Sequence, residues 1–358
     1  MKIKIFIHLC LFKNIFTDRI LGMKKLITLL VTTLFISQIS YSADIEIATT
    51  MQSVPNGRDR VWSGAFQMAW NDLRNKTIHA HIRFPEGTPT EVAELNQRFF
   101  TKENAPKGFY YKIADRVKPN SKQKIEKKIS KKFGETSEVL SSIDMTPSKK
   151  RYFAYAMMKK DFQYAEPFEN LGMSEFGQEQ SAEYYGLKKG ADQYLRRNVK
   201  VLFYNSPHDY AVKLLGDNEE DIVLYRSVSN KPFNYVYGDI LRKARDFEGI
   251  KVFTEEDTLK VPKISISEEI NYTEFADKRI KGTTKYLDSA FSSIRFSLDG
   301  SGIVPKKRKK VPDLVINPKY EIVPRDFAFN DTFFIFVKGR YLSRPYCAIR
   351  INDISQFQ

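Results

Sequence analysis

The sequence predicts an α+β protein with a large mixed, mostly antiparallel central sheet, flanking helices and a buried C-terminal β-hairpin. Two observations carry this prediction. Apolar segments of strand length follow one another across turns that contain Gly, Asn and Pro, and tandem strand–helix units are few. The 358 residues are 42% hydrophobic and 28% charged, a balance that excludes a disordered or collagen-like chain.

The first 42 residues are typical of a leader. Two lysines follow Met23, and an apolar run over 26–36 comes next. The small residues Ser40 and Ser42 then occupy the −3 and −1 positions of a cleavage site, as in a secretory signal peptide. The run is shorter than the about 20 residues that span a bilayer, so we expect no transmembrane span in the mature chain. We interpret Met23 as the initiator and expect export to the periplasm or the exterior.

Removal of residues 1–42 changes the charge and the cysteine count. The formal net charge falls from +15 to +10, because the leader holds six basic residues and one acid. Cys10 is lost with the leader and Cys347 remains, so no internal disulfide can form. We expect residues 43–358 to fold as a single domain that stays monomeric and is stabilised by its core.

Apolar residues at three- and four-residue spacing predict helices. The clearest is 121–133, where Ile125, Ile129 and Phe133 form one apolar stripe, lysines cover the other faces and Gly134 follows as the C-cap. The full set of predicted helices spans residues 61–75, 89–100, 121–133 and 240–247.

Alternating or continuous apolar runs between turn residues predict strands. Turns at 205–207 and 216–218 separate three of them, and the run 289–298 fits either a strand or the end of a helix that leads into one. The predicted strands span residues 79–84, 152–158, 199–204, 211–215, 221–225, 260–267, 289–298, 332–337 and 346–351.

Five motifs stand in order between about residue 121 and the C-terminus. They are the basic helix before Gly134, the strand 152–160 followed by Tyr164 and Pro167-Phe168, the segment Val261-Pro262-Lys263-Ile264, the strand 294–301 ending in Asp299-Gly300-Ser301, and the segments 329–336 and 345–351. In this order they resemble the motifs of serpins, the serine protease inhibitor superfamily, and the chain resembles a divergent, bacterial-type member.

The resemblance has departures and a limited extent. Ala156 stands where the family has Asn, Tyr164 where it has Trp, and Thr332 where it has Pro. Residues 43–120 match no motif of the family, so the resemblance covers about residues 121–358.

The resemblance implies a serpin-like domain with an exposed loop at about 300–326. An inhibitory serpin offers such a loop as bait to a serine protease and, after cleavage, inserts it into the main sheet as a new strand. The resemblance places the hinge of this loop at Asp299, Gly300, Ser301 and Gly302. The reactive-loop candidates that would meet the protease are Lys306, Lys307, Arg308, Lys309 and Lys310.

The residues of the loop argue against insertion. Pro305 lacks the N–H that a central strand needs, and five consecutive cations are costly to bury without partners. We expect a protein that binds or inhibits a serine protease through this loop. A plain exposed connection remains open as an alternative.

A second function also remains open. The protein would be a non-inhibitory binding protein of the envelope or the exterior that recognises an anionic polymer or a lipid. Its basic surfaces would be the run 306–310 and the helix 121–133.

The sequence predicts no enzyme, no cofactor and no metal site. His79 and His81 would share a face of a predicted strand, but no third ligand lies near them in the sequence. His208 stands in a turn, and Cys347 lies in an alternating strand where a free cysteine packs as a small hydrophobe. No Gly-rich phosphate loop is present.

Overall fold

The computed structural model describes residues 45–106, 108–217, 219–304 and 322–358. The predicted leader 1–42, its initiator Met23 and the basic run 306–310 lie outside the described residues. Within the described ranges, no helix combines the length and the apolar character that crossing a membrane requires.

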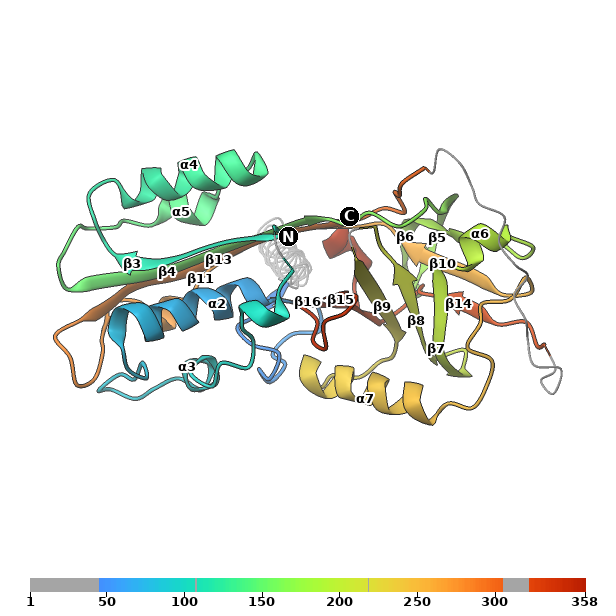
Figure 1. Cartoon of the computed structure of the whole chain (residues 1–358), viewed down its shortest axis with the longest axis horizontal. Coiled ribbons are helices and arrows are strands. Elements are labelled where there is room, and N and C mark those ends of the chain that lie inside the picture. Colours follow the sequence, from blue (N-terminus) through green and yellow to red (C-terminus); the bar gives the residue numbers. More distant parts are fainter. Residues whose placement is uncertain (1–44, 107, 218, 305–321) are drawn as a thin grey trace, which may run out of the picture. The chain divides into compact units, whose positions relative to one another are not determined.

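The main sheet has the strand order β11-β13-β4-β3, with β12 paired to the outer part of β13. Its two central strands, β4 and β13, run parallel and pair directly from Tyr286 opposite Arg151 to Ser297 opposite Asp161 (Figure 1). Both outer pairings are antiparallel. The strands are β3 (Tyr110–Arg116), β4 (Arg151–Asp161), β11 (Ile264–Asn271), β12 (Lys278–Arg279) and β13 (Tyr286–Leu298).

Two further sheets complete the fold. A seven-stranded sheet has the order β1-β2-β16-β15-β9-β8-β7, and a four-stranded sheet has the order β14-β10-β6-β5. The first comprises β1 (Glu46–Ala48), β2 (Arg60–Ser63), β7 (Val199–Ser206), β8 (Asp209–Leu215), β9 (Glu220–Arg226), β15 (Phe333–Gly339) and β16 (Cys347–Ile351). The second comprises β5 (Glu169–Phe176), β6 (Gln180–Leu187), β10 (Thr258–Pro262) and β14 (Asp326–Ala328).

Helices lie on both faces of the main sheet. Figure 1 shows α4 and α5 along one face and α2 along the other. The helices are α2 (Gly64–Asp72), α3 (Thr90–Leu95), α4 (Ser121–Phe133), α5 (Glu138–Ser142), α6 (Gln193–Arg196) and α7 (Phe233–Asp246), with a π-helical turn at Leu73–Ile78 and short 3₁₀ turns at Lys102–Asn104, Thr273–Phe275 and Ile354–Phe357.

Strand β4 is buried on both faces because helices cover both. Its odd-numbered residues Phe153, Tyr155 and Met157 pack in one cluster with Ile125 and Ile129 of α4. Its even-numbered residues 154, 156 and 158 belong to the larger core cluster that also contains α2. The whole stretch 153–158 is inaccessible to solvent, so any strand placed beside it would also be buried.

The predicted α+β class, the helix 121–133 and the closing hairpin are confirmed. Gly134 ends α4 with φ 68°, in the left-handed region that favours glycine. The run 289–298 is a strand, and the helix predicted for 240–247 is the end of α7, which begins after Pro232.

Four predicted elements are wrong in type or extent. The helix predicted over 89–100 is α3, which ends at Leu95. Residues 61–63, predicted as the start of the helix 61–75, belong to strand β2, which pairs with β16, and α2 begins after it with Ser63 as its N-cap. Residues 79–84 form no strand, because His79 ends the π-helical turn with φ 63°. Residues 260–267 split at Lys263 into β10 and β11, which belong to different sheets.

Candidate functional site

The predicted hinge residues follow the end of β13 and run beside the segment 164–168. The Tyr164 N–H donates to the Ser301 carbonyl at 2.8 Å, and the Ile303 N–H donates back to the Tyr164 carbonyl at 3.1 Å. The Phe168 N–H donates to the Gly300 carbonyl at 3.0 Å. The parallel pairing of β4 and β13 therefore continues past both strand ends as a bridge between Tyr164 and Gly302.

Two of the predicted hinge positions accept only glycine. Gly300 has φ +82°, and a Cβ built there would lie 2.6 Å from the Cγ atom of Tyr185. A Cβ on Gly302 would lie 2.4 Å from the backbone carbon of Glu166. Asp299 supports this turn, since its Oδ1 accepts the N–H of Ser301 at 3.0 Å. Steric contacts thus explain why both of these positions in the sequence Asp-Gly-Ser-Gly are occupied by glycine.

Tyr164 is the buried centre of the site. Its hydroxyl lies 2.6 Å from that of Tyr185, and its ring meets Phe168 edge to face at 4.7 Å between centroids. Burial raises the pKa of both tyrosines well above the ordinary value. Both phenols stay protonated at neutral pH, so one hydroxyl donates and the other accepts.

The opposite side of this segment is fixed by the turn after β8. The Ala165 N–H donates to the Leu215 carbonyl at 3.0 Å, and Tyr164 also forms an antiparallel bridge with Gly216. A Cβ on Gly216 would come within 2.5 Å of the Phe162 ring. The segment 164–168 is therefore bonded on one side to the predicted hinge and on the other side to the turn at Gly216.

A buried polar chain crosses the line where β4 and β13 meet. Tyr155 of β4 lies 3.3 Å from Ser293 of β13 between hydroxyl oxygens, and Ser137 lies 3.2 Å from the same Ser293 oxygen. Ser137 also donates to Glu269 of β11 at 3.4 Å. Separating β4 from β13 would break this chain as well as the backbone pairing.

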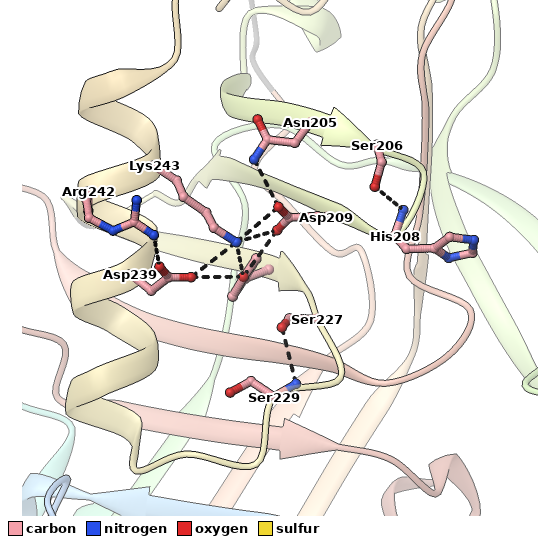
Figure 2. A network of polar contacts seen from close by, with 10 residues as sticks. Asn205, Ser206, His208, Asp209, Ser227, Ser229, Asp239, Arg242 and Lys243 are labelled. Atoms are coloured by element: carbon pink, nitrogen blue, oxygen red, sulfur yellow. Dashed lines mark hydrogen bonds and ion pairs between the residues drawn. The ribbon is translucent and has the colours of Figure 1, made fainter.

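A second polar cluster joins α7 to the β7–β8 hairpin, away from the hinge. Figure 2 shows Lys243 of α7 pointing toward Asp209, with ammonium–carboxylate distances of 2.8 and 3.0 Å. The ammonium also donates to the Tyr225 hydroxyl at 2.9 Å and pairs with Asp239 at 3.2 Å. The lysine is thus satisfied by groups of the fold itself, so its role is to fasten the helix.

The other residues singled out from the sequence lie apart from the hinge. His79 and His81 are exposed and on no strand, and no group of three metal-ligating side chains exists among the described residues. His208 is exposed in the β7–β8 turn. Cys347 is a fully buried free cysteine in β16, and burial raises the pKa of its thiol far above the usual value. The reactive-loop candidates Lys306, Lys307, Arg308, Lys309 and Lys310 lie outside the described residues.

Sequence reasoning missed Tyr185 and Gly216 as parts of the site. The alternating stretch around Tyr184-Tyr185 could have indicated strand β6. Gly216 is readable from the sequence as a turn residue, but nothing local indicates that its turn touches Phe162.

Several solved structures that are similar to this chain are serpins. No family model matches the sequence, and neither does any curated protein. Similar solved structures include a tumour-suppressing serpin (7% identity over 66% of this chain and 65% of that one, TM-score 0.44) and maspin (9% identity over 65% of each chain, TM-score 0.45). A further one is Serpin48 of the insect Tenebrio molitor, 12% identical over 83% of this chain and 92% of its own, TM-score 0.44. The chain covers 65% of the length of the first two. The fold of this chain, from its own helices and sheets, is α+β.

Proposed function

We propose that the protein presents the loop after Gly302 to a serine protease that prefers basic residues, and that it binds this protease without inserting the loop into the main sheet. The supporting observation is the fixed hinge, since Ser301 and Ile303 both bond to Tyr164. Directly after it, Ile303 and Val304 are 53% and 76% exposed. The five cations that a trypsin-like specificity pocket accepts follow in the sequence.

Insertion between β4 and β13 is opposed by the cost of burying these cations. An inserted strand would lie antiparallel to both neighbours. With Ile303 opposite Asp161, one-to-one register puts residues 306–310 opposite 158 to 154, the fully buried part of β4. Burying an unpaired ion costs several kcal/mol, so five of them cost on the order of 20 kcal/mol. That exceeds the about 5–15 kcal/mol that stabilises a typical domain.

The test is the affinity for trypsin whose serine nucleophile has been replaced by alanine, so that binding is measured without cleavage. The protein is compared with a free peptide of residues 299–326. We expect at least tenfold tighter binding of the protein, because the hinge has already fixed one end of the loop. Equal affinities would overturn the proposal that the fold presents the loop.

A control variant separates the loop from other basic surfaces. Replacement of residues 306–310 by glutamine should abolish binding, whereas Lys188→Gln with Lys231→Gln, two exposed lysines elsewhere, should leave it unchanged. Loss of binding in both variants would mean that net charge alone attracts the protease.

A second candidate function rests on helix α4. Its lysines 124, 127, 128, 131 and 132 are exposed, while Ile125 and Ile129 are buried beneath it. A cationic surface of this kind binds polyanions by displacing counterions. The measurement is salt-dependent retention on heparin resin. Retention that is lost when the α4 lysines become glutamine would support this function, and retention that ignores the change would contradict it.

A further inference from the structure

A cavity of about 590 Å³ lies at the start of the edge strand β7. One wall is the junction of α6 and β7, and the opposite wall is the segment 251–253. That segment runs along the outer edge of β7, since the Val201 N–H donates to the Lys251 carbonyl at 3.2 Å and Lys200 forms a bridge with Val252. The remaining wall comes from Glu166 and Leu215.

The floor of this cavity is apolar. Val199 and Phe253 are buried at 3% and 1% exposure, and Leu215 and Val252 are partly buried beside them. Backbone pairing holds these residues in place, since the Leu215 N–H donates to the Asn198 carbonyl at 2.9 Å. The cavity is therefore preformed, and its volume is that of a typical small-molecule site, about 300–1,000 Å³.

The rim is strongly cationic. Among the described lining residues, four are basic (Arg196, Arg197, Lys200 and Lys251) and one, Glu166, is acidic. Two of the cations are anchored to backbone carbonyls. Arg196 Nε donates to Ala191 at 2.9 Å, which leaves its terminal nitrogens for another acceptor, and Lys251 Nζ donates to Ala244 at 2.8 Å.

Three of these four cations are not neutralised by any carboxylate of the described residues. Across the described ranges, no carboxylate lies within ion-pair distance of Arg196, Lys200 or Lys251. An anion that entered the cavity would meet several donors at its rim at once. Guanidinium groups bind carboxylate, sulfate and phosphate through paired hydrogen bonds, which adds geometric selectivity to the charge attraction.

We infer that this cavity binds an amphipathic anion, a small molecule with an apolar body and one carboxylate, sulfate or phosphate group. The apolar body would cover Val199 and Phe253, and the anionic group would lie at the rim near Arg196 and Lys251. A bare anion would leave the apolar floor exposed to water, and a neutral hydrocarbon would leave the charges of Arg196, Lys200 and Lys251 without a counter-charge. Binding of this ligand requires no protease.

The probe is decanoate at concentrations below micelle formation, titrated into the full chain by calorimetry. Decanol supplies the same chain without the charge, and inorganic phosphate supplies an anion without the chain. We expect decanoate to bind at least tenfold more tightly than either. Decanol binding as tightly as decanoate would overturn the inference, and so would phosphate competing fully with decanoate.

Variants locate the site. Lys200→Gln with Lys251→Gln should weaken decanoate binding at least tenfold, while the control pair Lys188→Gln with Lys231→Gln should not change it. Both lysines of the first pair are exposed, so the variant is expected to fold, and an unchanged circular dichroism spectrum checks this. Single Lys200→Glu provides a charge reversal if the pair fails to fold. Undiminished binding by these variants would place the ligand elsewhere and contradict the inference.

Discussion

The replacement Gly300→Ala tests whether the hinge is locked by steric contact. The new Cβ would lie 2.6, 2.8 and 2.9 Å from the Cγ, Cδ2 and Cβ atoms of Tyr185, all closer than real Cβ contacts. These atoms belong to a side chain whose hydroxyl is bonded to Tyr164, so the ring cannot move aside without breaking that bond. Alanine must also adopt φ +82°.

The expected cost is the sum of two effects. A non-glycine residue in the left-handed region costs about 1–2 kcal/mol, and forcing extra volume into a packed core costs about 1–3 kcal/mol. Gly300→Ala should therefore lower the free energy of unfolding by about 2–5 kcal/mol. Gly190→Ala is the matched control, because Gly190 has φ +76° and an added Cβ would meet no atom within 4 Å, and it should cost only about 1–2 kcal/mol.

The assay is urea unfolding of both variants, followed by tryptophan fluorescence, with the midpoint and the slope compared. A lower midpoint at constant slope measures the loss of stability. If Gly300→Ala costs no more than Gly190→Ala, Tyr185 does not confine the hinge and the reasoning about a fixed departure point of the loop is wrong.

Three further outcomes follow from the described contacts. Tyr164→Phe should lower the free energy of unfolding by about 1–3 kcal/mol in urea, because it leaves the buried Tyr185 hydroxyl without its partner. The double variant with Tyr185→Phe should recover part of that loss. Purely additive effects of the two replacements would contradict this. Lys243→Met should cost about 1.5–3 kcal/mol at pH 7. Burial lowers the pKa of Lys243, but hydrogen bonds to Asp209 and Tyr225 raise it more, so its net shift is upward. The contribution of Lys243 to stability is thus fully present below its unfolded pKa, about 10.4. This contribution is lost as the pH rises through the higher folded pKa. A difference in unfolding free energy between wild type and Lys243→Met that grows above about pH 11 would refute the assignment. Cys347 should react with a thiol reagent only at the rate of unfolding, since its thiol is buried and its pKa raised, and rapid labelling of the folded protein would be inconsistent with that burial.

The elements that the sequence predicts correctly are those whose pattern is local and strong. The helix 121–133 has one apolar stripe and a glycine cap, and the hairpin of β15 and β16 is a pair of long apolar runs. Arg60–Ser63 could not be assigned locally, because its strand exists only through pairing with β16, far along the chain near the C-terminus. The strand expected at 79–84 fails because the π-helical turn before it ends in a left-handed His79.

The sequence singles out the glycines of the candidate site but not the residues that they contact. Asp299-Gly300-Ser301-Gly302 follows a long strand, and motif order alone indicates a hinge there. Tyr185 lies far away in the sequence on a strand of another sheet, and nothing near it indicates contact with Gly300. The amphipathic cavity beside β7 is equally hidden from the sequence, because Arg196, Lys251 and Phe253 meet only after α7 has returned the chain to the edge of β7.

The most direct measurement of protease binding without insertion is the thermal unfolding midpoint before and after cleavage of the loop by active trypsin. A loop that enters the sheet as a strand adds hydrogen bonds to both β4 and β13 and must raise the midpoint. We expect cleavage within residues 306–310, no complex that survives SDS, and an unchanged or slightly lower midpoint. A clear rise of the midpoint, or an SDS-stable complex with the protease, would show that the cations enter the sheet and would contradict the proposed mechanism.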